Sequence, residues 1–329
     1  MRIALHTLRL PAALFAAALS VAGFAQGEKA TLSQINLALQ AGEADRALEL
    51  TASLPQDGAN NAEARNLECR VRFTLQQWDA AANACGQAVQ LDGANSDYHM
   101  WLGRALGEKA DRASFWTAFS LGKQVRVEFE QAVRLNPRNS AALSDLGSFY
   151  YAAPGMIGGG IDKAESIAAQ LDKIEPSRAH QLRGGIDEQR GDYGGAEREL
   201  KEAIATSAHP AFQWTVLGSF YRRRHEWSQM EWAIHSCVEA AAHDKTAGVA
   251  LYDGAGVLIK AKRDPELAAQ MLAAYLVSSS RTEEAPTFVA HLRLARLKQQ
   301  LGDAAGAKRE QEAAYALAHE YSPAQERKD

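Results

Sequence analysis

The sequence predicts an all-α protein, an α-solenoid of about eight stacked helix pairs. From Thr31 onward, apolar residues recur at three- and four-residue spacing, with Gly or Asp between the blocks, which is typical of successive amphipathic helices. Two complementary halves of one helix-pair pattern lie next to each other, and their equivalent residues Gly184 and Gly218 are 34 residues apart. A single helix pair cannot bury its apolar face, so a recurring pair predicts a stacked array.

The strongest copy of the pattern lies in residues 177–238. Its second half carries the motif W-x2-L-G-x2-Y, formed by Trp214, Leu217, Gly218 and Tyr221. Its first half carries a matching turn and second helix, formed by Gly184, Gly191, Asp192, Tyr193, Ala196, Leu200 and Ala203. Small residues at such positions let paired helices approach closely, while the aromatic and Leu side chains fill the space between pairs. These residue types therefore indicate packing rather than chemistry.

The remaining units are weaker copies of the same pattern. The first unit, 31–55, lacks the Leu-Gly of a first helix and is expected to form the amino-terminal cap, because terminal repeats are atypical. Further units are predicted at 62–92, 96–137, 140–176, 252–272 and 294–314. The solenoid is thus expected to occupy 26–321. The polar residues 322–329 are expected to form a flexible tail.

Residues 1–25 differ from the rest of the chain. Arg2 and Arg9 precede an apolar stretch that begins at Leu10, and small residues around Gly23 and Ala25 suit cleavage. The apolar stretch is shorter than the ~20 residues of a spanning helix. We therefore expect a cleaved bacterial signal peptide, a periplasmic or secreted protein, and no stable membrane span after cleavage.

The three cysteines are consistent with an oxidising compartment. Cys69 and Cys85 would face each other on the two helices of one unit, either as a disulfide or as two small packing residues. Cys237 stands where the pattern calls for Ala, which predicts that it is buried.

Two turns appear enlarged, at 107–124 and 151–160. Turns inside successive units line up along one edge of a solenoid, so both insertions should be neighbours there. The favoured interpretation of Phe115, Trp116 and Phe119 is that they extend the second helix of the third unit and are buried under the Gly-rich stretch, because aromatic residues at helical spacing are typical of a core. The alternative is that these residues and Met156 form a functional edge that encloses a small molecule.

The sequence contains no pattern that indicates catalysis. No H-E-x-x-H or G-x-S-x-G motif occurs, and the nine His residues show no spacing typical of metal ligands. The run Gly155–Gly160 precedes Lys163 but departs from a phosphate-binding loop, so a structural loop is favoured. The net charge of -4 gives no footprint for nucleic acid. We expect no enzyme activity, no cofactor and no metal.

The motif quoted above and its second copy, at Leu143, Leu146, Gly147 and Tyr150, resemble those of tetratricopeptide-repeat proteins. The resemblance covers essentially the whole chain after the signal peptide. Residues 106–110 and 153–160 also look like a subgroup of secreted bacterial repeat proteins without a defined role. Arg183 and Asp187 depart from the pattern, because they stand where Leu and an aromatic residue are expected.

The resemblance implies a right-handed superhelix whose concave face binds protein segments. The inward-facing positions that it implies are Arg104, Tyr151, Arg178, Gln181, Arg222, Arg223, Lys260 and Arg296. Their Arg side chains favour a mildly acidic polypeptide, since guanidinium groups pair with carboxylates. The expected function is that of an exported, non-catalytic scaffold for a protein or peptide partner in the cell envelope. The alternative is a transport-accessory or solute-binding component.

Overall fold

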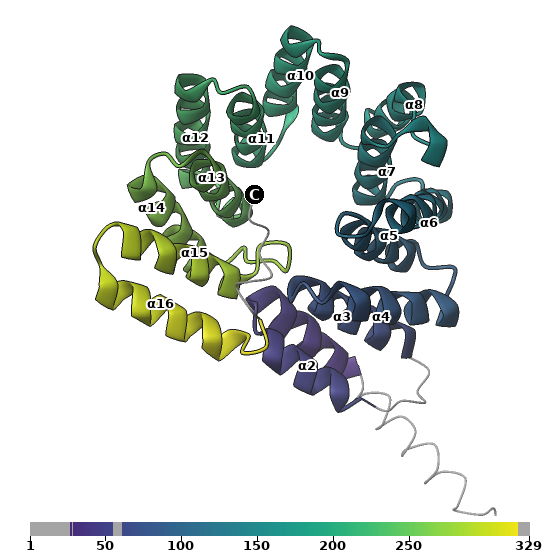
Figure 1. Cartoon of the computed structure of the whole chain (residues 1–329), viewed down its shortest axis with the longest axis horizontal. Helices are drawn as coiled ribbons and strands as arrows, with labels where there is room; N and C mark the ends of the chain where they lie inside the picture. Colours follow the sequence, from purple (N-terminus) through teal and green to yellow (C-terminus); the bar gives the residue numbers. More distant parts are fainter. Residues whose placement is uncertain (1–26, 28, 55–60, 322–329) are drawn as a thin grey trace, which may run out of the picture.

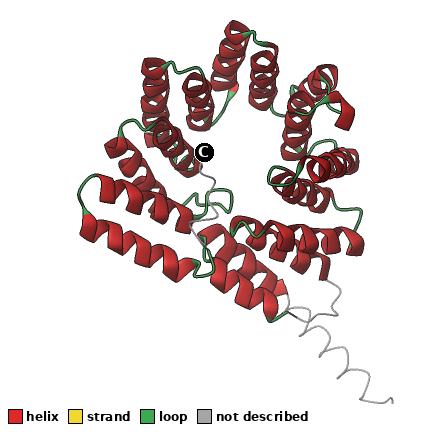
Figure 2. Ribbon diagram, in the orientation of Figure 1, coloured by secondary structure: helices red, strands yellow, loops and turns green. Residues whose placement is uncertain are grey.

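The computed structural model describes residues 27, 29–54 and 61–321. All regular structure in these residues is helical, with no strand, as Figure 2 shows. The signal peptide expected at 1–25 and the tail expected at 322–329 lie outside the described residues. The predicted all-α class is therefore confirmed for the part of the chain that is described.

Eight successive helix pairs make up the described array, which matches the expected number. A helix over 29–41 begins it. The helices that follow are α2 (Ala44–Ala52), α3 (Asn61–Thr74), α4 (Trp78–Leu91), α5 (Ser96–Ala110), α6 (Phe115–Leu135), α7 (Ser140–Ala152), the 3-10 helix η1 (Gly155–Ile157), α8 (Ile161–Leu171), α9 (Pro176–Arg190), α10 (Tyr193–Thr206), α11 (Pro210–Arg223), α12 (Trp227–Ala242), α13 (Gly248–Ala261), α14 (Pro265–Leu276), α15 (Thr287–Gln300) and α16 (Ala304–Leu317). The first helices of the pairs form the inner layer and the second helices the outer layer (Figure 1).

Small residues bring the helices together at the predicted positions. Gly147 lies so close to Leu182 of α9 that an added Cβ would collide with that side chain. A Cβ on Gly218 would lie 2.8 Å from Cδ1 of Ile234 on α12, the second helix of its own pair. The Leu-Gly motif therefore marks close contacts both within and between pairs.

A disulfide joins the second pair. Cys69 on α3 and Cys85 on α4 are bonded, with their Cα atoms 5.1 Å apart. Cys237 is a free thiol that is fully buried, as its place in the pattern predicts. Burial raises the pKa of the Cys237 thiol to about 12, so this sulfur stays protonated.

Most of the excess length at 107–124 is helical rather than a turn, and Phe115, Trp116 and Phe119 extend the second helix of the third unit as the favoured interpretation predicted. Helix α5 continues to Ala110, and α6 begins at Phe115 and runs for 21 residues. Phe115 and Trp116 are 68% and 79% exposed, so the expectation that they are buried under the Gly-rich stretch is wrong, while Phe119 is half-buried. The second insertion is a real loop, since residues 153–160 contain only the single turn of η1.

The array closes into a ring, which the sequence did not predict (Figure 1). Helix α16 contacts α2, and Thr287 at the start of α15 donates a hydrogen bond of 2.7 Å to the carbonyl of Ala41. Leu39 and Leu75 belong to the same hydrophobic core as Phe288 and Tyr321. The first unit, which was expected to form the amino-terminal cap, packs against the last unit.

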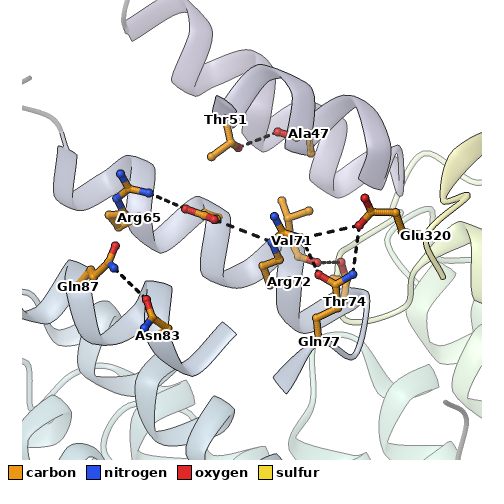
Figure 3. A network of polar contacts seen from close by, with 11 residues as sticks. Ala47, Thr51, Arg65, Val71, Arg72, Thr74, Gln77, Asn83, Gln87 and Glu320 are labelled. Carbon is orange, nitrogen blue, oxygen red and sulfur yellow. Dashed lines mark hydrogen bonds and ion pairs between the residues drawn. The ribbon is translucent and has the colours of Figure 1, made fainter. Parts of the chain in front are cut away.

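Polar contacts join α3 to the last described residues of the chain (Figure 3). The Arg72 guanidinium lies 3.7 Å from a carboxylate oxygen of Glu320, and Gln77 donates to the same oxygen at 3.2 Å. His319 bonds to Asp45 of α2 at 2.6 Å. We call this seam, between the helix over 29–41 with α2 and α3 and the chain from 277 onward, the closure junction.

Candidate functional site

The inner layer contains a groove with a volume of about 520 Å³, which we call the central groove. Four first helices, α3, α11, α13 and α15, and the loop at 277–286 contribute most of its wall, and Trp101 of α5 completes it. The groove exists because closure brings α3 and α5 close to the last two pairs. An open array would hold these walls apart.

Aromatic side chains form part of the wall. Phe73 and Trp101 make an edge-to-face contact with ring centroids 5.5 Å apart. The Arg104 guanidinium stacks over Trp101 at 4.9 Å, and that of Arg293 over Tyr252 at 4.6 Å. Such cation–π contacts hold the guanidinium groups flat against the rings. The result is a surface with both apolar and charged groups.

The loop at 277–286 adds two carboxylates to this wall. Glu283 accepts hydrogen bonds from Nε and Nη2 of Arg70, at 2.8 and 2.6 Å, across the closure junction. Glu284 accepts one from Arg104 at 3.0 Å, and Arg104 also donates to Asp145 at 2.6 Å. The buried hydroxyl of Tyr275 donates to the carbonyl of Ala285 and so fixes the loop.

Two charged side chains stand out on the wall of the groove. Arg222 on α11 and Asp253 on α13 line the groove, and neither side chain forms a hydrogen bond or ion pair with another described residue. Burial raises the pKa of Asp253 to about 6, the nearby Arg293 lowers it, and Glu284 raises it. An uncompensated guanidinium and a half-buried carboxyl with a raised pKa are both suited to receive polar groups of a ligand.

The inward positions predicted from the sequence do not form one site. Arg222 and Lys260 line the central groove, and Arg104 lies at its edge through Glu284. Arg178 and Arg223 lie elsewhere on the first helices, where they pair with Glu175 at 2.8 Å and with both carboxylate oxygens of Glu188 at 2.7 Å. Tyr151 and Gln181 are half-buried, and Arg296 is exposed. Of this set, Arg222 has a guanidinium without a carboxylate partner among the described residues.

Four charged residues that shape the groove were not predicted: Arg70, Glu283, Glu284 and Arg293. Arg70 and Arg293 each lie among several basic residues of a first helix, and the repeat pattern does not distinguish them from the others. The signal that could have found the other two is the adjacent pair Glu283-Glu284, just before Pro286 between two units. Loops of this kind often carry function.

The predicted insertion edge is open to solvent at two of its residues. Trp116 and Met156 are 79% and 67% exposed, so they do not wall a closed cavity. Among the residues that the structure describes, no group of three or more His, Cys, Asp or Glu side chains could hold a metal ion. No helix in the described ranges is both long enough and apolar enough to cross a bilayer.

The eight pairs, with the Leu-Gly motifs at their contacts, define the architecture. The fold is of the tetratricopeptide-repeat type. No family model matches the sequence, and no curated protein matches it. Solved structures that are similar include TTC0263, a thermophilic TPR protein of Thermus thermophilus, at 18% identity and a TM-score of 0.49, over 59% of this chain and 98% of that one. MamA is similar at 14% identity and a TM-score of 0.34, over 52% of this chain and 93% of its own.

Proposed function

We propose that the protein is an exported, non-catalytic scaffold that holds a segment of a protein partner in the cell envelope through its central groove. The observation that carries the proposal is the groove wall itself, which combines aromatic rings with Arg222 and Asp253, two side chains that form no hydrogen bond or ion pair with another described residue. Aromatic residues and Arg are enriched among the residues that dominate protein interfaces. Support for export comes from the basic start, apolar stretch and small residues of 1–25.

The side chains of the groove fit an extended polypeptide that offers both hydrogen-bond acceptors and hydrogen-bond donors. Arg222 can donate paired hydrogen bonds to a carboxylate or single ones to main-chain carbonyls. Asp253 can accept from main-chain N–H groups, and ligand binding there would favour its ionised form. The other carboxylates of the wall, Glu283 and Glu284, already pair with Arg70 and Arg104. A mildly acidic segment with apolar side chains is therefore the preferred ligand.

The test is capture from inside the groove in the native organism. A photo-crosslinking residue replaces Ser219, which lines the groove on α11, and crosslinked proteins are identified after irradiation. We expect a defined partner, and the additional substitution Arg222→Glu should reduce its yield at least tenfold. Lys308→Glu, which makes the same charge change on the exposed face of α16, should leave the yield unchanged.

The two parts of the proposal fail separately. Equal yields from the Ser219 probe with and without Arg222→Glu would exclude the groove as the binding site. Export is measured by sequencing the amino terminus of the protein recovered from the periplasm or medium, which should begin near Gln26. Recovery of the intact chain only from the cytoplasm would contradict export.

A further inference from the structure

The amino-terminal end of α6 is the longest helical overhang described in the array. Helix α6 has 21 residues, whereas its partner α5 has 15 and α8 has 11. We call its first two turns, residues 115–122, the α6 prong. Phe115 and Trp116 lie at its tip with 68% and 79% of their surfaces exposed, and their rings meet edge to face at 5.2 Å. Two large aromatic rings held together in solvent indicate a surface that something covers.

A third large apolar side chain is exposed on η1, which contacts α6. Helix η1 packs against α6, where an added Cβ on Gly122 would lie 2.9 Å from Cδ1 of Ile157. The neighbouring Met156 is 67% exposed. The loop that touches the base of the prong thus presents a further exposed apolar side chain, Met156.

The prong itself carries no charged side chain, and Lys123 follows it directly in the sequence. Residues 112–127 contain Arg112, Lys123 and Arg126 and no acidic residue. Lys123 makes no ion pair with a described residue, and its ammonium lies 4.3 Å above the Phe119 ring. Arg112 pairs with Glu108, and Arg126 pairs with Glu130, both from outside this range. The nearest acidic residue before it in the chain is Asp111, in the turn between α5 and α6.

We propose that the α6 prong docks the protein onto the surface of an anionic lipid bilayer. Trp and Phe side chains favour the boundary between headgroups and acyl chains, and an uncompensated Lys beside them is attracted to anionic headgroups. A protein partner for a basic surface would be expected to supply carboxylates, but the aromatic tip would still need an apolar pocket. The bilayer provides both the apolar layer and the negative charge without a shaped pocket.

The inference is independent of the proposed groove function. The prong belongs to the outer layer of the ring, and the central groove belongs to the inner layer (Figure 1). A chain held by the prong therefore keeps the groove free for its partner.

The test uses the purified chain from Gln26 onward, which contains every described helix and lacks the apolar segment at 1–25. Binding is measured by co-sedimentation with vesicles of phosphatidylglycerol and phosphatidylethanolamine, and with vesicles of phosphatidylcholine alone. We expect binding to the anionic vesicles and at least fivefold less binding to phosphatidylcholine. The double variant Phe115→Ser, Trp116→Ser should lose at least 90% of the bound fraction, and Lys123→Glu should weaken binding two- to fivefold.

Tyr315→Ser is the matched control, because Tyr315 on α16 is 68% exposed, as Phe115 is, and lies outside the prong. This variant should bind as the unsubstituted chain does. Circular dichroism melting of each variant shows whether it is folded. Brominated lipids should quench the fluorescence of the unsubstituted chain and quench that of Trp116→Phe less. No vesicle binding by the unsubstituted chain, equal binding by the double variant, or equal binding to both vesicle types would each overturn the proposal.

Discussion

The closure junction and the junctions between consecutive pairs differ in the sequence separation of the residues that they join. Between α11 and α13 the contact is apolar and close, since an added Cβ on Gly254 would lie 3.4 Å from Cγ2 of Thr215. The closure junction combines a shared apolar core with charged contacts, among them the Arg70–Glu283 and Asp45–His319 pairs. Consecutive junctions also contain charged contacts, such as Arg104–Asp145 between α5 and α7 and Arg223–Glu188 between α11 and α9. They join neighbouring pairs, whereas the closure junction joins residues as far apart as Arg70 and Glu283, which are separated by 213 residues.

The largest expected effect comes from opening a consecutive pair. Leu217 is fully buried in the Leu-Gly motif of α11, so Leu217→Ala should lower the free energy of unfolding by about 3 kcal/mol through lost burial and a cavity. Urea denaturation followed by circular dichroism measures the change. Leu301→Ala, at a half-exposed site, should cost less than about 1 kcal/mol. Equal losses in the two variants would contradict the packing assigned to the motif.

Removing the disulfide should have a slightly smaller effect. The bond between Cys69 and Cys85 spans 16 residues and staples α3, which carries one side of the closure junction, to α4. The double variant Cys69→Ala, Cys85→Ala should lose about 2–3 kcal/mol, because loop closure no longer restricts the unfolded chain. Denaturation with and without a reductant measures this loss. Reductant should not affect the double variant, and an unchanged midpoint of the unsubstituted chain on reduction would refute the bond.

Breaking the charged contact of the closure junction should cost about 2 kcal/mol. Glu283→Gln leaves the partly buried Arg70 guanidinium without its carboxylate. The ring should then open part of the time, which small-angle X-ray scattering detects as an increased radius of gyration. The exposed Glu312→Gln serves as the control. A Glu283→Gln variant with unchanged stability and radius would show that the apolar core alone closes the ring.

The smallest effect concerns Asp253, whose pKa reports on the loop of the closure junction. The folded pKa of about 6 lies above the ordinary value of 3.8, so the folded state keeps a proton that the unfolded state releases between these values. Stability therefore falls as pH rises from about 4 through 6, and Asp253→Asn should be about 1–2 kcal/mol more stable than the unsubstituted chain at pH 7.5.

The two proteins should be similarly stable near pH 4, where both carry a neutral side chain at this position. Denaturation midpoints across this pH range provide the measurement. In a ring opened by Glu283→Gln, Glu284 should move away from Asp253, and the difference should shrink. A constant difference at all pH values would mean that Asp253 does not titrate in the folded protein as described.

Repetition decided how much of the fold could be predicted from the sequence. Gly147 and Gly218 could be placed at helix contacts because each occurs in a Leu-Gly motif whose geometry recurs along the chain. Closure depends on the small rotation of each pair relative to the previous one, added over eight pairs, and it joins Arg70 to Glu283 across 213 residues. A local sequence pattern does not determine this total rotation. The exposure of Phe115 and Trp116 at the start of α6 was not predicted for a different reason. Exposed aromatic residues and buried ones have the same helical spacing.

In the candidate site too, residues inside the repeat pattern could be predicted from the sequence and residues outside it could not. Arg222 and Lys260 were placed on the groove wall because inward positions recur in every first helix. Glu283 and Glu284 stand outside the repeat, so their contribution could be seen only in three dimensions. The predicted carboxylate-binding role of Arg104, Arg178 and Arg223 remains a prediction, although each already holds a carboxylate of its own chain.

Closure of the ring also determines when the first units can finish folding. The core that contains Leu39 and Leu75 is completed by Phe288 and Tyr321, so the first part of the chain to emerge during synthesis needs the last part. Contacts of such high sequence separation slow folding, because the long intervening chain must lose its freedom before they form. Until residue 321 is available, the helices of the opening units present unfinished apolar surfaces, and nascent or truncated chains will depend on chaperones more than those of a linear repeat array.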